Sequence, residues 1–362
     1  SDGAVFLPVG SLNELRRKAV LALEEELARR QGPDPERRRF SSSAAVDTGA
    51  DEGETRFSLL SEAEAPGGGG LSGFCRSPEK EQRAGGFCRN RLQVSVRTPQ
   101  QLSAALAEGV GRIYADYGLS GALPELLKTS SFCPQTTQIY GATPYIVRKK
   151  DIVWLEKIWK LVECGLLKGI LIRNLESFSF FRDRFQGKLP AERLVLDCGL
   201  YLWNRQALKF WEGRAGEFFL PAECNGREWR ELLSACPDRR LRAGAVVYGY
   251  LPVMISANCL KKTFRGCEKK PGLTWLKDRC GKRFPVYTDC LCCYNVIFNS
   301  VPLSFHRQMG KLALDGGYRM DLTLEDEETS RRLIRYFAGL GEGYGDPFYT
   351  DYTTGHYKRG VE

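Results

Sequence analysis

The hydrophobic positions between residues 92 and 250 follow a regular alternation. Short runs rich in β-branched and aromatic residues alternate with segments of helical length, whose apolar residues recur every three or four positions. This alternation is typical of repeated strand–helix units and a parallel sheet. The predicted strands begin at residues 92 (LQVSVR), 112 (RIYAD), 137 (TQIYGATPYI), 169 (GILIR), 193 (RLVLD), 217 (EFFLP) and 244 (GAVVYGY).

An eighth strand is predicted either at YNVIF from residue 294 or at YRMDL from residue 318. Thr98, Pro99 and Gln101 begin the helix after the first strand, with an N-cap, a proline at the first helical position and a capping glutamine. Seven or eight such units predict an α/β fold, a (β/α)8 TIM-like barrel, over residues 91–362. A doubly wound open sheet is the alternative, but no glycine-rich dinucleotide motif follows the first strand.

The first 90 residues have a different pattern. Residues 11–30, SLNELRRKAVLALEEELARR, begin with a capping box formed by Ser11 and Glu14 and continue with apolar residues at helical spacing. We therefore expect an N-terminal helical segment over residues 1–31. Residues 32–90 are rich in Gly, Ser, Glu, Arg and Pro, so they cannot bury enough apolar surface to offset their ordering entropy. This composition predicts a flexible linker.

Composition and charge narrow the classes of function without selecting one. The 362 residues, 43% hydrophobic and 11% aromatic, are sufficient for a large globular domain. The sequence has no run of about 18 apolar residues to span a bilayer and no secretory signal at its start, so we expect a soluble, cytoplasmic protein without membrane contact. The 13 cysteines are scattered, which fits a reducing compartment. A net charge of +9 permits a polyanionic partner without requiring one.

Polar residues follow several of the predicted strands. In a barrel of this type the C-terminal ends of the strands carry the reactive groups, so these residues together are candidates for a pocket. Each of them alone is also typical of a residue that caps the following helix. The residues are Asp116, Arg173, Asn174, Asp197, Glu223, Asn225 and Tyr250.

The densest group of cysteines follows the seventh strand. Cys290 and Cys293 have C-x2-C spacing, which lets two thiolates bind one metal or cluster from a single turn. Cys259 and Cys267 precede them and can supply two more ligands. Four thiolates suit zinc or an iron–sulfur cluster, and spacing does not separate the two. A position after the last strands of a large domain favours a functional iron–sulfur cluster over a structural zinc ion. The same region also contains Cys280 and Cys292.

A basic segment accompanies these cysteines. Over residues 259–283 nine Lys and Arg residues face two acidic residues, and nine minus two leaves a net charge of +7. With Phe264 and Trp275 this segment could hold the phosphates of RNA and stack an unpaired base, whereas a charge run is also typical of a solvated loop. The candidate RNA-binding residues are Lys261, Lys262, Arg265, Lys269 and Lys270.

Most of the chain resembles a known family. The resemblance is to the collagenase-like peptidase family, in particular to the C-terminal part of its long iron–sulfur hydroxylases of ribosomal RNA. The stretches that carry it are YGYLPVMISANCLKKTFRGC, LKDRCGKRFPVYTDCLCCYNVIFNSVPLSF, YRMDLTLE and TTGHYKRGVE. The opening FLPVGSLNELRRKAV resembles a segment that precedes the second barrel portion of those long proteins. The resemblance covers residues 92–362 and the first 25 residues.

The resemblance implies an iron–sulfur protein rather than a zinc protein. It implies hydroxylation of a pyrimidine in ribosomal or transfer RNA, with prephenate as a co-substrate and RNA as the partner. Cys280 is then a reserve ligand, at a position where the family has a polar residue. The implied ligands of a 4Fe–4S cluster are Cys259, Cys267, Cys290 and Cys293.

The resemblance also supplies candidate catalytic residues. At the end of the sixth strand LPAECN departs from the family's usual Ser-Pro-Glu-Leu-Asn, although its Glu and Asn match. The matched residues are Glu223, Asn225, Arg319 and His356.

Two other functions remain open. The family name implies a peptidase that acts on collagen-like chains, but His306 and His356 are the only histidines, and the sequence has neither an H-E-x-x-H nor a G-x-S-x-G motif. The other alternative is a non-catalytic, RNA-binding half of a longer protein.

Overall fold

The computed structural model describes Lys18, Ala22 and residues 91–360, except for 185–187, 236–240, 310, 311, 313 and 341–345. The side chains of residues 264 and 265 are also outside this description. The chain divides into two compact units, Ser1–Cys75 and Arg76–Glu362. The predicted N-terminal helical segment and the predicted linker lie outside the described residues, apart from Lys18 and Ala22, which have helical backbone.

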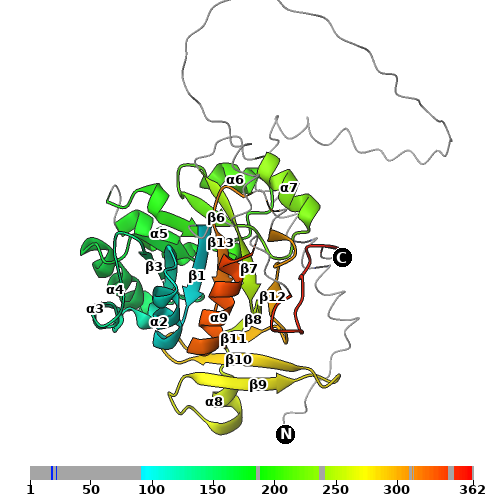
Figure 1. Cartoon of the computed structure of the whole chain (residues 1–362). Helices are drawn as coiled ribbons and strands as arrows, with labels where there is room; N and C mark the ends of the chain where they lie inside the picture. The colour runs from blue at the N-terminus through cyan, green and yellow to red at the C-terminus, as the bar shows by residue number, and fades with distance from the viewer. Residues whose placement is uncertain are drawn as a thin grey trace, which may run out of the picture. The chain divides into compact units, whose positions relative to one another are not determined.

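The second unit contains a closed barrel of parallel strands with helices between consecutive strands (Figure 1). The strands pair in chain order from β1 to β7, and β13 pairs with both β7 and β1. The pairing of Leu92 with Tyr318 closes the ring, so the predicted barrel is confirmed. The barrel strands are β1 (Leu92–Val96), β2 (Arg112–Asp116), β3 (Gln138–Ala142), β4 (Gly169–Ile172), β5 (Leu194–Leu196), β6 (Glu217–Phe219), β7 (Arg242–Gly249) and β13 (Tyr318–Asp321).

The helices between the strands have the expected local signals. At the start of α2 the Thr98 hydroxyl accepts a hydrogen bond from the Gln101 amide at 3.2 Å, and the Gln101 side chain accepts one from the Arg97 amide at 2.9 Å. Among the described residues, no helix is long and apolar enough to cross a membrane. The helices are α2 (Pro99–Ala107), α3 (Leu123–Lys128), α4 (Ile152–Glu163), α5 (Leu175–Arg184), α6 (Arg205–Trp211), α7 (Gly226–Ser234) and α9 (Glu327–Ala338).

An antiparallel sheet is inserted between β7 and β13, and it lies below the barrel in Figure 1. Its strand order is β8 (Pro252–Ser256), β11 (Tyr294–Phe298), β10 (Arg283–Asp289) and β9 (Gly272–Lys277). The short helix α8 (Leu260–Arg265) connects β8 to β9, and β12 (Leu303–Ser304) pairs with β7. Of the two positions predicted for an eighth barrel strand, YRMDL is correct, and YNVIF belongs to the inserted sheet.

The N-terminal end of the barrel interior is filled by a buried ion-pair group around Glu217. Gln93 on β1 donates a hydrogen bond to Glu217 on β6 at 3.3 Å. These two strands are not neighbours in the barrel, so the contact crosses its interior. Arg112 and Arg242 bind the same carboxylate at 2.7 and 3.2 Å. This group is structural because it lies at the end of the barrel away from the C-terminal ends of the strands.

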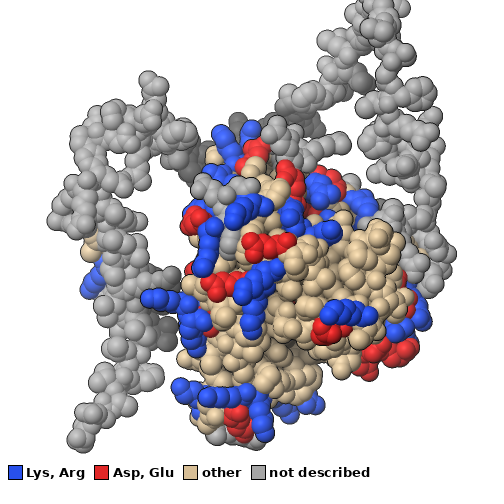
Figure 2. Space-filling view, turned by 90° about the vertical axis from the view of Figure 1, so that its left-hand side faces the viewer, with Lys and Arg blue, Asp and Glu red and all other residues tan. Residues whose placement is uncertain are grey.

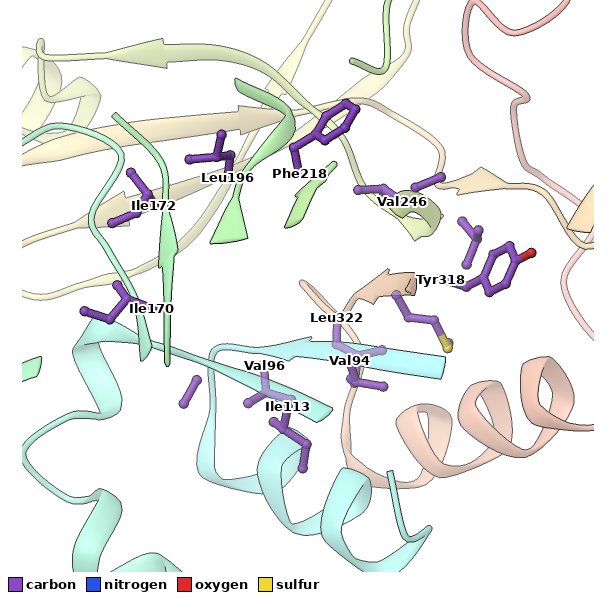
Figure 3. Packing of buried hydrophobic residues seen from close by; sticks show 14 of the residues in the cluster. Val94, Val96, Ile113, Ile170, Ile172, Leu196, Phe218, Val246, Tyr318 and Leu322 are labelled. Atoms are coloured by element: carbon purple, nitrogen blue, oxygen red, sulfur yellow. The ribbon is translucent and has the colours of Figure 1, made fainter. Parts of the chain in front are cut away.

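Two apolar layers lie above and around this group. Inside the barrel, Tyr114 and Phe219 meet edge to face with ring centroids 6.0 Å apart, together with Tyr140, Leu171 and Val195. The opposite sides of the strands form the larger core, because alternate residues of a strand point to opposite faces. Figure 3 shows part of this core, including Val94, Val96, Ile113, Ile170, Ile172, Leu196, Phe218 and Val246.

Candidate active site at the barrel mouth

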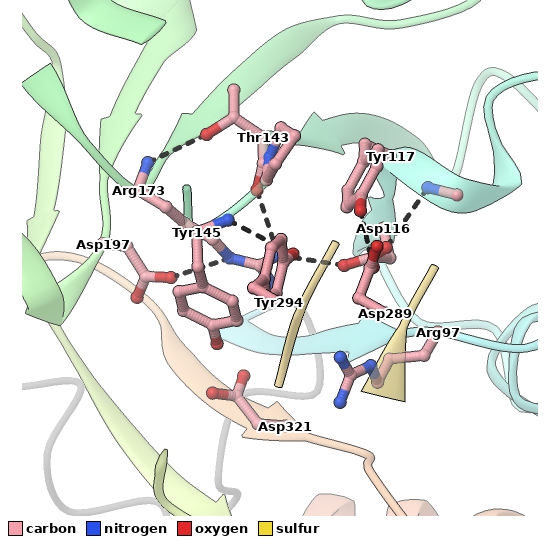
Figure 4. Close-up of polar contacts among 12 residues, drawn as sticks. Arg97, Asp116, Tyr117, Thr143, Tyr145, Arg173, Asp197, Asp289, Tyr294 and Asp321 are labelled. Carbon is pink, nitrogen blue, oxygen red and sulfur yellow. Dashed lines mark hydrogen bonds and ion pairs between the residues drawn. The ribbon is translucent and has the colours of Figure 1, made fainter. Parts of the chain in front are cut away.

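Five charged side chains meet inside the mouth of the barrel, at the C-terminal ends of its strands. Arg173, directly after β4, binds Asp116 of β2 at 2.9 Å and Asp197, after β5, at 3.2 Å. Arg319 of β13 binds the other oxygen of Asp197 at 2.7 Å. It also holds Asp321, two residues further along β13, through two contacts of 2.7 and 3.0 Å. Figure 4 shows most of this group, in which two guanidinium groups pair with three carboxylates from the ends of four strands.

Two of these carboxylates also hold the backbone that follows their strands. Asp116 accepts a hydrogen bond from the Gly118 amide at 3.2 Å, and Asp197 accepts one from the Cys198 amide at 2.8 Å. Asp116 and Asp197 therefore both cap the turns that follow their strands and belong to the charged group at the mouth. Each carboxylate fixes the turn with one oxygen and reaches an arginine across the interior.

The Asp197 carboxylate is held in its ionised form. Burial opposes its ionisation, but the guanidinium groups of Arg319 and Arg173 outweigh burial and lower the pKa of Asp197 to about 2. Burial raises the pKa of the neighbouring Tyr145 to about 12, so its phenol stays protonated even in mildly alkaline solution. The mouth thus offers fixed charges together with a neutral hydroxyl donor.

Two arginine groups at the mouth keep unused hydrogen-bonding capacity. Arg97, which follows β1, stacks its guanidinium over Tyr287 at 4.2 Å and over Phe298 at 5.3 Å, and has no carboxylate partner among the described residues. The Nη1 atom of Arg319 is buried, with no hydrogen-bond partner in the described part of the chain. Arg319 itself is only 2% exposed and lies 4.1 Å over the ring of Phe219. A buried, unpaired N–H is costly, so a further acceptor at this point would be stabilising.

The turn between β10 and β11 is fastened to the rim of this mouth. Asp289 accepts a hydrogen bond from the phenol of Tyr117, after β2, at 2.5 Å, and also accepts one from the Cys292 amide at 2.8 Å. Arg148, after β3, donates to the Cys292 carbonyl at 2.5 Å. Cys292 is buried beneath the turn, and burial raises the pKa of its thiol to about 12. The turn is therefore held by two loops of the barrel.

The four predicted thiol ligands come from segments at one end of the inserted sheet. Cys259 follows β8, and Cys267 precedes β9. The turn that carries Cys290 and Cys293 is at the same end, because the end of β8 pairs with the start of β11 and the start of β9 with the end of β10. Cys280 lies in the β9–β10 turn, and the 7 residues of β10 place it about 20 Å away at the opposite end. The predicted reserve ligand is thus remote from the other thiols.

Three of the predicted ligands are electrostatic neighbours. Burial raises the pKa of Cys290, and the nearby thiols of Cys259 and Cys293 raise it further, while Lys261 lowers it. Cys267 is exposed. The thiols do not form a ligand sphere in this arrangement: within the described ranges, no group of three or more His, Cys, Asp or Glu side chains is placed to hold a metal ion. A cluster bound here would need Cys267 and its neighbours to converge further.

The predicted RNA-binding residues surround the same end of the sheet. Lys261 lies on α8, and its ammonium group donates to the Lys270 carbonyl at 3.2 Å. Lys262, Lys269 and Lys270 are exposed, and the side chain of Arg265 lies outside the described residues. Figure 2 shows Lys and Arg side chains gathered at the lower end of the molecule, the end at which Figure 1 places α8 and the inserted sheet.

Of the four predicted catalytic residues, Arg319 is in the charged group and the other three are not. Asn225 is the N-cap of α7 and accepts hydrogen bonds from the amides of Arg227 and Glu228. The ring of His356 is exposed and lies 2.9 Å from the Gly360 carbonyl. No hydrogen bond or ion pair within the described residues joins Glu223, Asn225 or His356 to Asp197. These three residues lie at the rim, where the C-terminal segment contacts the start of α7.

Several residues of the mouth are not among those that the sequence singles out. Tyr145 falls within the longer third strand that the sequence predicts, although β3 ends at Ala142. Asp289 and Tyr117 show no motif, and their contact joins segments 172 residues apart. Arg97 and Asp321 each stand at the end of a predicted strand, which is the signal that could have identified them.

The comparisons with known proteins do not assign this chain to a family. No protein-family model matches the chain, and no curated protein matches it. Among solved structures, the U32 peptidase Mk0906 is similar at 8% sequence identity and a TM-score of 0.33, over 46% of this chain and 72% of that chain. An uncharacterized protein of B. cereus is similar at 10% identity and a TM-score of 0.36, over 68% of this chain and 65% of that chain. At such scores these likenesses carry no argument about activity.

Proposed function

We propose that this chain is an iron–sulfur enzyme that hydroxylates a pyrimidine of ribosomal or transfer RNA at the barrel mouth, with prephenate as co-substrate. One observation carries the proposal. The turn that bears Cys290 and Cys293 is bonded through Asp289 to Tyr117, on the loop after β2, whose Asp116 belongs to the charged group. A thiol-rich segment beside a mouth of fixed charges favours redox chemistry over purely hydrolytic chemistry.

Cys259, Cys267, Cys290 and Cys293 are the residues that we propose as ligands of a 4Fe–4S cluster. Support comes from their common end of the sheet and from the closeness of Cys259 and Cys293 to Cys290, whose pKa both thiols raise. A bound cluster would supply electron transfer, and we assign it no further step because the thiols do not yet form a ligand sphere. Zinc remains the alternative occupant, since four thiolates suit both.

The guanidinium groups of the mouth support a carboxylate co-substrate such as prephenate. The guanidinium of Arg97 lies over two aromatic rings and has no carboxylate partner among the described residues, and the buried Nη1 atom of Arg319 has no hydrogen-bond partner there either. Arginine binds carboxylates through paired N–H donors and stays charged at all relevant pH values. Asp197 fixes the position of Arg319, and the protonated phenol of Tyr145 can donate a hydrogen bond to a bound oxygen.

A peptidase is less well supported by the positions of the histidines. His306 is buried, and its Nδ1 atom lies 2.8 Å from the Ser304 hydroxyl, so neither side chain is open to a polypeptide substrate. His356 is exposed, but its ring is engaged with the Gly360 carbonyl. A hydrolytic nucleophile requires a base within hydrogen-bond reach and access to the scissile bond.

The decisive experiment compares RNA from cells with and without the gene by mass spectrometry, alongside the protein purified without oxygen. We expect loss of one oxygen atom's mass from a single pyrimidine when the gene is absent, and iron with acid-labile sulfide in the purified protein. An unchanged RNA profile would refute hydroxylation. Gelatin cleavage that survives removal of the metal would identify the protein as a peptidase instead.

A further inference from the structure

One side of the inserted sheet faces the barrel mouth. Tyr287 and Asp289 are alternate residues of β10, so their side chains point to the same face. Tyr287 stacks against Arg97 at 4.2 Å, and Asp289 is bonded to Tyr117. Both partners belong to loops at the C-terminal ends of barrel strands. The face of the sheet that carries Tyr287 is therefore the mouth-facing face.

This face continues beyond the mouth along the edge strand β9. Leu273 lies opposite Tyr287 in the strand ladder, Trp275 opposite Pro285, and Lys277 opposite Arg283. Residues directly opposite one another in a sheet share a face, so Leu273, Trp275 and Lys277 all lie on the mouth-facing side. Their exposure is large nonetheless, at 44% for Leu273 and 47% for Trp275. The barrel therefore does not cover these two side chains, and this part of the mouth-facing face is open to solvent.

Cationic groups accompany the exposed ring. The guanidinium of Arg283 lies 4.9 Å from the centroid of the Trp275 ring. Over residues 272–283 four basic residues face one acidic residue, and four minus one leaves a net charge of +3. A large exposed ring with a guanidinium beside it is typical of surfaces that stack nucleic-acid bases and hold their phosphates.

We propose that Leu273, Trp275, Lys277 and Arg283, the β9 track, bind an unpaired segment of RNA and lead it toward the mouth. The choice of RNA as ligand rests on the proposed function. Trp275 would stack one base, while Lys277 and Arg283 hold the neighbouring phosphates. From Trp275 the face passes by Leu273 to Tyr287 and the mouth, so a strand laid on the track would deliver its next bases there.

The chemistry of the track favours a single strand over two other occupants. A duplex keeps its bases stacked inside and would offer Trp275 only backbone. A protein partner would match the apolar side chains and Arg283, but lysine is depleted at protein interfaces, so Lys277 and the net charge of +3 favour such a partner only if it is acidic. An acidic polypeptide is therefore the competing occupant to be tested.

The test measures binding of a fluorescein-labelled oligouridylate to the full chain by fluorescence anisotropy. We expect Trp275→Ala to weaken binding about tenfold, because one base loses its stacking partner, and Trp275→Phe to retain most of the affinity. Arg283→Ala should reduce the salt dependence of binding. Met254→Ala is the matched control: Met254 is 57% exposed but lies opposite Ile297, on the other face of the sheet.

Three results would overturn the β9 track. They are unchanged affinity of Trp275→Ala, equal binding of a duplex of the same length, and equally tight, Trp275-dependent binding of a polyglutamate peptide. Photo-crosslinking of a 4-thiouridine strand to the wild-type protein gives a second readout, and the track requires a crosslinked peptide from residues 272–287. Hydroxylation is scored separately by mass spectrometry, so RNA binding through Trp275 without hydroxylation would reject the proposed function and leave the track in place.

Discussion

The Tyr117 phenol donates a hydrogen bond of 2.5 Å to Asp289, and this contact joins the barrel to the cysteine-bearing turn of the inserted sheet. Both side chains are buried. Asp289 also accepts bonds from the amides of Leu291 and Cys292 at 2.9 and 2.8 Å, so the same carboxylate shapes the turn and docks it. Together with the bond from Arg148 to the Cys292 carbonyl, this carboxylate sets the position of the neighbouring Cys290 relative to the mouth.

Replacement of Tyr117 by Phe should loosen this turn. The Asp289 carboxylate would lose its buried hydrogen-bond donor. This loss should lower the free energy of unfolding, measured by urea denaturation, by about 1–3 kcal/mol. Hydrogen exchange at residues 290–293 should accelerate. Tyr201→Phe is the control, because Tyr201 is 52% exposed at the rim and should change stability little. Equal exchange rates in the Tyr117 variant and the wild type would show that the turn is held by other contacts.

The low pKa of Asp197 predicts a specific acid sensitivity. A carboxylate whose pKa falls from an ordinary 3.8 to about 2 in the folded state stabilises the fold above the ordinary value. That contribution, of about 2 kcal/mol, disappears as the pH falls from 3.8 toward 2. In Asp197→Asn this part of the acid dependence should be absent.

The same variant should be destabilised at neutral pH. Asp197→Asn leaves Arg173 and Arg319 buried with less compensating charge, which typically costs about 3–5 kcal/mol. Asp183→Asn provides the matched control, since Asp183 pairs with Arg182 in the exposed part of α5. If both variants lost equal stability, the charged group at the mouth would not be the source of the effect.

The proposed function makes Arg97 a binding residue for the prephenate carboxylate. Its guanidinium is free of carboxylates among the described residues, so Arg97→Ala should raise KM for prephenate by roughly 10- to 100-fold, the range expected for a lost charge-assisted contact. Loss of the stacking over Tyr287 and Phe298 should lower the unfolding free energy by only about 1 kcal/mol, so the variant stays folded for the KM measurement. Arg227→Ala, which removes only an exposed pair with Glu231, serves as control and should leave KM unchanged. A KM unaffected by Arg97→Ala would place the carboxylate elsewhere.

The barrel could be predicted from the sequence because each of its strands is a short run of apolar, β-branched or aromatic residues that can be recognised locally. Runs such as GILIR are buried on both faces, and this is the pattern that a parallel sheet covered by helices imposes. Asp116, Arg173 and Asp197 are recognisable at strand ends, and the structure brings them together. YNVIF is ambiguous, since a buried strand of an inserted sheet has the same composition as a barrel strand.

The inserted sheet could not be predicted because its edge strand does not bury its side chains. GLTWLK and the start of RFPVYTD belong to the basic segment of residues 259–283, and most residues of β9 are exposed. Their pairing is set by the hairpin from residue 278 to 282, where Asp278 and Lys282 bond through their backbones. The contact between Tyr117 and Asp289 is likewise tertiary, so it leaves no local signal.

The thiols at the two ends of the inserted sheet provide the sharpest test of metal binding. Cys259→Ser, Cys290→Ser and Cys293→Ser should each lower the iron content of protein purified without oxygen, because the three thiols lie near one another and the cluster requires all its ligands. Cys280→Ser should retain full iron, since Cys280 lies at the other end of β10. Cys267→Ser should lower the iron content as well, because this exposed thiol is the fourth proposed ligand and has to approach the other three when metal binds. Stoichiometric zinc without iron would exclude the iron–sulfur cluster, whereas equal iron loss in the Cys280 variant would mean that metal binds without regard to the geometry of the sheet.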